Sequence, residues 1–486
     1  MHDLTINKIW QPCLKSRVVY SFYYTVKTDF ETFLRALRLI PIISNFNKLN
    51  RISRSPALKT LLIAFALVFG TLSSKAYSIL AHEAIVDASW KSSILPLIQK
   101  KYPNLTEAEI KMAHSYAYGG AMVADMGYMP FGNAFFTDLL HYVRSGDFVE
   151  TLIKDAQNTN EYSFALGALS HYMADRYGHS LATNRNIALI YPKLQKRFGD
   201  VVTYNDDHKS HSRMEFSYDV LQTGRGTYTT EGYHDFIGFN IAVPVLEKAF
   251  YETYGQELGS IFSNINGSIN TLRWGIRNLF PVLTKSAFST NKDTILKMTP
   301  GMTAKKFQYK MSKKSFRLEY GKQRQESKFF SRVIVFLIKV LPKVGPLKTL
   351  KYVSPGKAGE KLFANSFDTI TTKYAIALKQ VDEKRLALTD IDFDTGKPSA
   401  LGEYPLADNT YDKLLVKLQE QKYKNITPQL QRNIVNYYKN ADTSQTAMKQ
   451  RKEWKKVIIS LKQIKALKPT GQDTLKPLDD PLGSTQ

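Results

Sequence analysis

Three side chains that commonly bind metal ions recur at four-residue intervals in one short stretch of the sequence. His171, Asp175 and His179 lie within residues 167–179, and the residues around them are largely apolar. A spacing of four places side chains one above another on the same face of an α-helix. A single histidine on an apolar helix is usually a core residue, but a carboxylate is costly to bury unless it is paired or bound to a metal. The stretch therefore predicts a helix that presents metal ligands to the interior.

More residues of the same kind lie on both sides of this stretch. His211 and Glu215 have the same four-residue spacing, and the upstream candidates are His82, Asp125 and His141. Histidine and carboxylate side chains without cysteine are suited to zinc in a hydrolytic site. Because a catalytic zinc normally has three protein ligands and one open position, the full set predicts a cluster of two or three ions.

The composition is that of a globular protein with a single cysteine. Of the 486 residues, 43% are hydrophobic and 23% are charged, and the chain is long enough for more than one domain. The one cysteine is Cys13, so the sequence excludes an intramolecular disulfide. It also excludes a cysteine nucleophile or a cysteine-ligated zinc in the main body of the chain.

The net charge of +24 is distributed unevenly along the chain. Residues 77–260 contain 15 Lys and Arg against 21 Asp and Glu, whereas residues 261–486 contain 41 against 19. An acidic region suits a cation site, and a basic surface attracts anionic partners such as phospholipid headgroups or nucleic acid. The alternative for the basic region is a solvated surface without a specific partner.

An apolar run near the N-terminus predicts export. Residues 61–72 are apolar, follow several basic residues, and precede small residues that end at Ala76. The run is too short to span a membrane, and its layout is that of a secretory signal peptide cut after Ala76. The alternative is a short buried helix. We therefore expect residues 1–76 to be a leader and the protein to be periplasmic or secreted.

The remaining sequence indicates helices rather than strands. Thr106 followed by acidic residues is a typical helix start, and strand-like alternation is scarce. We expect an all-α domain over residues 77–260, with inward-facing ligands on several helices as in metal-bearing bundles. Residues 261–465 are expected to be basic and mostly helical, and residues 466–486 to be a disordered tail. The apolar segment 329–341 predicts a core helix or, as the alternative, a helix on a membrane surface.

With these residues in view, the sequence resembles the zinc-dependent phospholipases C. Their superfamily also contains fungal single-strand-specific nucleases and glycosylphosphatidylinositol phospholipase D, and the resemblance covers about residues 77–260. In that superfamily the mature chain begins at its first metal ligand, whose terminal amine and carbonyl bind zinc, and a His-Glu pair follows. Tyr77 and the pair His82-Glu83 have this layout, with Tyr77 where the family usually has tryptophan.

The resemblance implies that the ligands are shared among three zinc ions. One ion would be held by Asp125, His141, His171 and Asp175. A second would be held by His179, His211 and Glu215, and a third by the backbone of Tyr77, by His82 and by Asp175 as a bridge. The interval of four residues between Asp175 and His179 resembles the branch that contains glycosylphosphatidylinositol phospholipase D, so the substrate class stays open. His208 is either an alternative ligand or an outer residue, and His114 and His234 are expected to be structural.

The function that the resemblance implies is an exported zinc-dependent phosphodiester hydrolase similar to phospholipase C. It would direct a metal-activated water onto a phospholipid headgroup ester, and Asp125 is the candidate to orient that water or accept its proton. The alternatives are a single-strand nuclease of the same fold and a metal-stabilised surface protein without catalysis. The expected partners are a phospholipid or other phosphodiester substrate and an anionic membrane surface, and no protein partner is inferred.

Overall fold

The computed structural model of the chain describes residues 79–129, 131–224, 238–276, five scattered positions between 283 and 293, 351–441 and 454–469. The expected leader, Tyr77, His234, the segment 329–341 and residues 470–486 lie outside the described residues. Within them, no helix is both long enough and apolar enough to cross a membrane.

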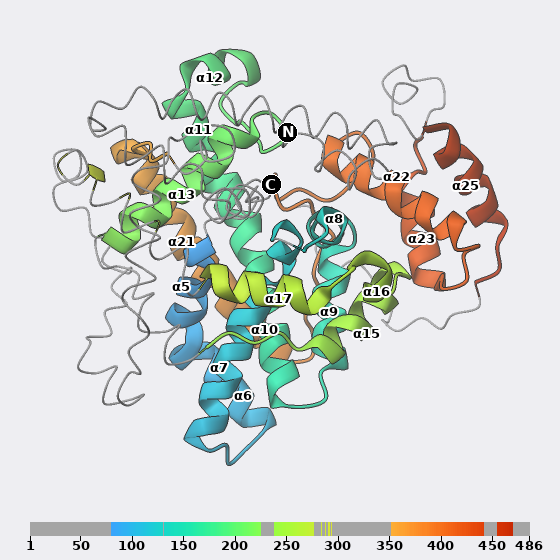
Figure 1. Ribbon diagram of the computed structural model, residues 1–486, viewed down its shortest axis with the longest axis horizontal. Coiled ribbons are helices and arrows are strands. Elements are labelled where there is room, and N and C mark those ends of the chain that lie inside the picture. Colours follow the sequence, from blue (N-terminus) through green and yellow to red (C-terminus); the bar gives the residue numbers. More distant parts are fainter. Residues whose placement is uncertain are drawn as a thin grey trace, which may run out of the picture.

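The fold is all-α, as the sequence predicts (Figure 1). The helices of the first part are α5 (Ile79–Ser89), α6 (Leu95–Lys101), α7 (Glu107–Met122), α8 (Ala134–Tyr142), α9 (Ser145–Asp155), α10 (Thr159–Gly178), α11 (Asn184–Ile190), α12 (Pro192–Phe198), α13 (His208–Gly224), α15 (Val243–Tyr254), α16 (Leu258–Ile261) and α17 (Ile265–Trp274). Those of the second part are α21 (Gly356–Asp382), α22 (Pro405–Glu420), α23 (Pro428–Tyr437) and α25 (Trp454–Ala466). A 3-10 helix, η2 (Val123–Tyr128), and two π-helical turns, η1 (Trp90–Ile94) and η3 (His179–Thr183), interrupt the first part.

Local sequence signals explain where the two central helices begin. Thr106 caps α7, because its side chain accepts the backbone N–H of Glu109 while the Glu109 carboxylate accepts that of Thr106. This reciprocal capping box satisfies two backbone donors that the first turn of a helix leaves without a partner. Asn158 caps α10 through its side-chain oxygen, which accepts the backbone N–H groups of Asn160 and Glu161.

Helix α10 forms the centre of the fold and packs closely on α7. A Cβ atom added to Gly120 on α7 would lie 1.8 Å from the backbone oxygen of Phe164, and one added to Gly167 on α10 would lie 2.0 Å from that of Ala117. Only glycine at these two positions permits the observed backbone separation. Because the helices approach so closely, the backbone of α7 comes within hydrogen-bonding reach of side chains on α10.

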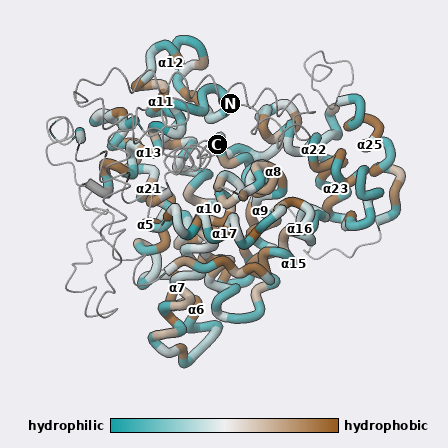
Figure 2. The backbone as a smooth tube through the Cα atoms, viewed as in Figure 1, coloured by the Kyte–Doolittle hydropathy of each residue, from teal (hydrophilic) through white to brown (hydrophobic). Residues whose placement is uncertain are grey.

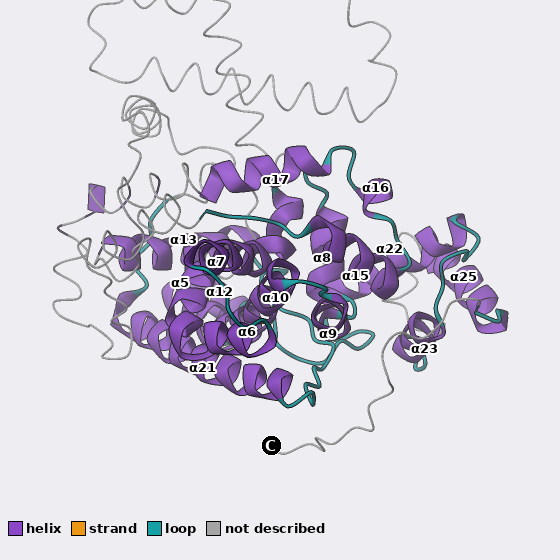
Figure 3. Cartoon of the chain, turned by 90° about the horizontal axis from the view of Figure 1, so that it is seen from below, coloured by secondary structure: helices purple, strands orange, loops and turns teal. Residues whose placement is uncertain are grey.

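The C-terminal helices pack on the same core rather than apart from it. Tyr374 on α21 donates its hydroxyl to the backbone oxygen of Leu166 on α10, at 2.8 Å. Figure 3 shows α21 along one side of the bundle and α17 on the opposite side. Hydrophilic residues predominate on the peripheral α12, which has no buried residue, whereas α15, half of whose residues are buried, shows more hydrophobic colour (Figure 2).

Candidate metal centre

The structure brings together the eight candidate ligands that lie within the described residues. They come from six elements: His82 on α5, Asp125 on η2, His141 on α8, His171 and Asp175 on α10, His179 on η3, and His211 and Glu215 on α13. Each of these side chains is at most about 2% exposed. They form three sets, and within each set the ligand atoms lie within 4.8 Å of one another: His82, His171 and Asp175; Asp125, His141 and His171; and His179, His211 and Glu215. The first two sets share His171, and the third shares no residue with them.

Asp175 lies between the first two sets. Its Oδ1 atom is 3.4 Å from Nε2 of His82, and its Oδ2 atom is 3.2 Å from Nε2 of His171 and 3.5 Å from Nε2 of His141. The imidazoles of His82 and His171 stack with their centroids 4.4 Å apart. Because its two oxygens face different histidines, Asp175 has the geometry of a carboxylate that bridges two ions.

The third set lies where α10 ends. His211 Nε2 is 2.9 Å and His179 Nε2 is 3.2 Å from the same oxygen, Oε1 of Glu215. His179 follows His171 by eight positions, a rise of about 12 Å along an α-helix, so these two histidines belong to different sets. Helix α10 ends at Gly178 and His179 opens the π-helical turn η3. Such turns are frequent at functional sites because they redirect side chains.

Backbone carbonyls orient three of the imidazoles. Nδ1 of His141 donates to the oxygen of Thr137 at 2.9 Å, and Nδ1 of His171 donates to that of Ala121 at 2.8 Å. Nδ1 of His179 donates to the backbone oxygen of Phe393 at 3.0 Å. A carbonyl can only accept, so each Nδ1 carries a proton and Nε2 is the ring nitrogen that faces the centre.

The donor atoms fit zinc. The carboxylate oxygens of Asp125, Asp175 and Glu215 are buried and form no hydrogen bond in the described part of the chain, and neither does Nε2 of His141 or His171. Ligands of a tetrahedral zinc, at about 2.0–2.2 Å from the ion, lie roughly 3.3–3.6 Å from one another. The N···O distances around Asp175, from 3.2 to 3.5 Å, are close to that range.

The electrostatics of the site also favour a cation. Burial raises the pKa of Asp125 to about 6 and raises that of Glu215 well above its usual value. Burial also lowers the pKa of the His211 imidazole to about 4, which keeps this ring neutral as a ligand must be. Carboxylates that are costly to ionise in the interior are stabilised by a bound divalent ion.

Two of the remaining histidines lie outside these sets. His208 is exposed, and its ring contacts that of Tyr204 with centroids 4.2 Å apart. His114 is buried, stacks on Trp90 and lies 3.2 Å from Asp87, so it has the structural surroundings that we expected. Glu83 is buried next to His82 in the sequence.

The comparisons with known proteins agree with this geometry. Residues 81–264 match the model of the family described as zinc dependent phospholipase C. This segment of the chain is similar to the zinc-dependent phospholipases C. The seven described candidates from Asp125 to Glu215, together with His82, all fall inside the matched range. Neither the curated proteins nor the solved structures compared with the chain gave a match.

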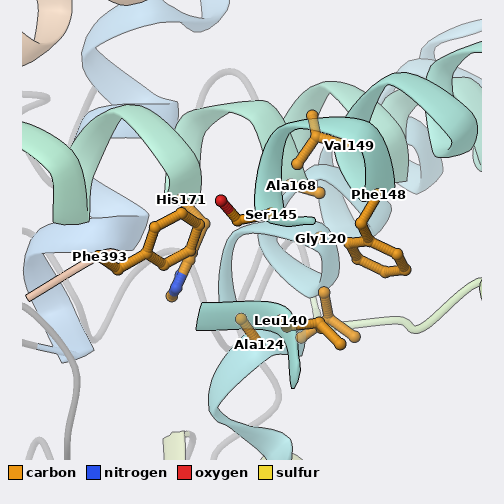
Figure 4. Close-up of a pocket in the computed structure, with 10 residues that line it drawn as sticks. Gly120, Ala124, Leu140, Ser145, Phe148, Val149, Ala168, His171 and Phe393 are labelled. Carbon is orange, nitrogen blue, oxygen red and sulfur yellow. The ribbon is translucent and has the colours of Figure 1, made fainter. Parts of the chain in front are cut away.

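An apolar pocket borders the phospholipase C-like site. It is lined by Gly120, Val123, Ala124, Leu140, Ser145, Phe148, Val149, Ala168, His171 and Phe393. Figure 4 shows the rings of His171 and Phe393 side by side at one end of this pocket. Phe393 comes from the C-terminal half of the chain, beyond the part that matches the zinc-dependent phospholipase C family.

The sequence reasoning missed Phe393 and its neighbour Asp394. Asp394 is fully buried, and its Oδ1 atom is 3.6 Å from Nδ1 of His179. A signal was present, because acidic residues alternate with apolar ones at Asp390, Asp392 and Asp394 and a glycine follows at Gly396. Nothing in that local pattern indicates that it lies beside residues more than 200 positions earlier.

Proposed function

We propose that this chain is an exported zinc-dependent phosphodiester hydrolase that cleaves a phospholipid headgroup ester. The match of residues 81–264 to the zinc-dependent phospholipase C family supports this reaction class. The observation that carries the proposal is the position of Asp175, whose two oxygens face His82 on one side and His171 and His141 on the other. A structural zinc needs four closed ligands, and the ligand set here is larger than that.

Two or three zinc ions bound at this centre would supply Lewis acidity and lower the pKa of a water molecule. Asp175 would hold neighbouring ions through separate oxygens, and His141 and His171 would present Nε2 because their Nδ1 atoms are committed to carbonyls. Asp125 lies at the edge of this group, with Oδ1 3.6 Å from Nε2 of His141. In this proposal Asp125 would orient the attacking water or accept its proton.

The deciding experiment tests three phosphodiesters as substrates of the purified protein. Phosphatidylcholine, a glycosylphosphatidylinositol and single-stranded DNA are each assayed with and without a chelator. We expect chelator-sensitive release of a phosphorylated headgroup from a lipid. Cleavage of DNA alone would support the alternative that the protein is a nuclease. A zinc-loaded protein that is inactive on all three substrates would support the non-catalytic alternative.

We further propose that export exposes Tyr77 as the new N-terminus and as a zinc ligand. Support comes from the signal-like run 61–72 and from α5, which places His82 beside Asp175 only five residues after Tyr77. N-terminal sequencing of the exported protein tests the cut after Ala76. A version with extra residues before Tyr77 that kept full zinc content and activity would contradict the role of the terminal amine.

We propose finally that the basic C-terminal region promotes adsorption to anionic membranes. Residues 261–486 carry 41 Lys and Arg against 19 Asp and Glu. Such attraction is screened by salt, with a Debye length of about 10 Å at 0.1 M. Sedimentation with phosphatidylglycerol vesicles should exceed that with neutral vesicles and should fall along a salt series. Equal sedimentation with both kinds of vesicle would contradict the proposal.

A further inference from the structure

A loop from the C-terminal half of the chain packs against the metal centre. We call residues 388–399 the C-terminal loop; it lies outside the segment that matches the family. Ser145 at the start of α9 holds it by accepting the N–H of Ile391 at 3.0 Å and donating to the oxygen of the same residue at 2.7 Å. Asp390 accepts the N–H groups of Gly146 and Asp147 at 3.1 and 3.0 Å. The loop is therefore fixed to the N-terminal turn of α9 immediately before it reaches the histidines.

Phe393 contacts three of the candidate ligands. Its N–H donates to the backbone oxygen of His141 at 3.0 Å, and its own oxygen accepts Nδ1 of His179 at 3.0 Å. Its ring packs against those of His141 and His171, with centroids 5.1 and 5.7 Å apart. One residue of the loop thus touches ligands from both ends of the centre.

Asp394 presents one carboxylate oxygen to His179. Its Oδ2 atom accepts the hydroxyl groups of Tyr142, at 2.8 Å, and Tyr404. Its backbone oxygen accepts the side-chain amide of Asn184 at 2.6 Å. These contacts fix the carboxyl group so that Oδ1, which forms no hydrogen bond in the described structure, lies 3.6 Å from Nδ1 of His179.

We propose that Phe393 and Asp394 are positioning residues of the metal centre, through which the C-terminal loop controls the affinity of the ion at His179, His211 and Glu215. The carbonyl of Phe393 holds Nδ1 of His179, so Nε2 faces Glu215. The buried carboxylate of Asp394 adds negative charge behind the imidazole, which makes the ring a stronger donor to a cation. The family segment is accordingly incomplete as a metal site without this loop.

Asp394→Asn tests the proposal, because it preserves the shape of the side chain and removes its charge. Asp392→Asn is the matched control: Asp392 lies two residues earlier, is equally buried, and its carboxylate accepts from Thr395 rather than facing a ligand. Zinc affinity of the full chain is measured by competition with a chromogenic chelator. We expect Asp394→Asn to weaken one site about 10–100-fold, as is usual for partners of a ligand histidine, and Asp392→Asn to leave all sites unchanged.

Tyr404→Phe is a second variant that tests the same proposal if Asp394→Asn fails to fold. It removes one of the two hydroxyl donors that fix Asp394, and we expect a smaller loss of affinity at the same single site. Thermal unfolding in chelator shows whether each apo variant is folded. A folded Asp394→Asn with wild-type affinity at every site would overturn the proposal. If Asp394→Asn does not fold, a Tyr404→Phe variant with wild-type affinity would overturn it instead. Failure of the proposed enzymatic function would look different: the zinc-loaded wild-type protein would cleave none of the three phosphodiesters, whatever the zinc affinities of the variants.

Discussion

The two ends of the metal centre use the same kinds of ligand but depend on different parts of the chain. At the Asp175 end, the carbonyls that orient His141 and His171 come from Thr137 and Ala121, both inside the family segment. At the Glu215 end, the carbonyl that orients His179 belongs to Phe393, which is 214 positions away. The carbonyls that orient the first end therefore come from α7 and α8, whereas the carbonyl that orients His179 at the second end comes from the C-terminal half of the chain.

The largest effect is expected at the residue shared between ions. Asp175→Ala should release more than one zinc per chain, because separate oxygens of this carboxylate face His82 and His171. Metal analysis after extensive dialysis measures the loss. His208→Ala, at an exposed position outside the three ligand sets, is the control and should keep the wild-type content. Loss of only one ion from Asp175→Ala would contradict the proposed bridging role of Asp175.

A smaller loss is expected when the other end alone is broken. Glu215→Gln should release one zinc and leave the ions near Asp175 in place, because Glu215 contacts His179 and His211 and neither of these belongs to the other two sets. The same metal analysis counts the ions that remain. Release of every ion from this variant would show that the two ends bind metal as one unit, which would contradict their independence.

The attachment of the C-terminal loop should respond to pH through Glu150. This side chain accepts the N–H of Leu388, and burial raises its pKa to about 8 from an ordinary value of 4.5. Because the folded state binds the proton more tightly, the stability contributed by the protonated carboxyl is full below pH 4.5 and is lost as the pH rises toward 8. Glu150→Gln does not titrate, so its stability relative to wild type should rise between pH 5 and 8, by on the order of 1–3 kcal/mol.

Denaturant unfolding of both proteins at pH 5 and pH 8 measures this difference. Glu257→Gln, at an exposed position, is the control, and its difference in stability from wild type should be the same at both pH values. A constant difference between Glu150→Gln and wild type at both pH values would contradict the assignment of the pH dependence to Glu150.

The smallest effect separates stability from metal binding. Thr106→Ala removes the capping box at the end of α7 that lies away from Ala121, and should cost about 1 kcal/mol of unfolding free energy. Its zinc content should equal that of wild type, because no ligand or orienting carbonyl lies in the first turn of α7. Thermal unfolding and metal analysis of one preparation give both values. Lost zinc in a folded Thr106→Ala protein would mean that the centre depends on the whole helix.

Several features followed from short-range chemistry and were predictable from the sequence. The all-α class came from helical patterns and the scarcity of alternation, and the structure confirms it. The start of α7 came from Thr106 and the acidic residues after it. The pairs His171–Asp175 and His211–Glu215 meet because residues four apart share a helix face, so their spacing alone sets the contacts of 3.2 and 2.9 Å.

Tertiary structure decided how these local pairs are brought together with residues of other helices, and which groups orient them. The contact of Asp175 with both His82 and His141 requires α5, α8 and α10 to converge. The hydrogen bond between His171 and the Ala121 carbonyl requires the close approach of α7 to α10 that Gly120 and Gly167 allow. The π-helical turn at His179 and the placement of Phe393 behind it are likewise invisible in a local pattern. The physical reason is range: capping and i, i+4 spacing act within one or two helical turns. The partners of a buried ligand are chosen by packing among segments that lie far apart in the sequence, up to 214 positions for His179 and Phe393.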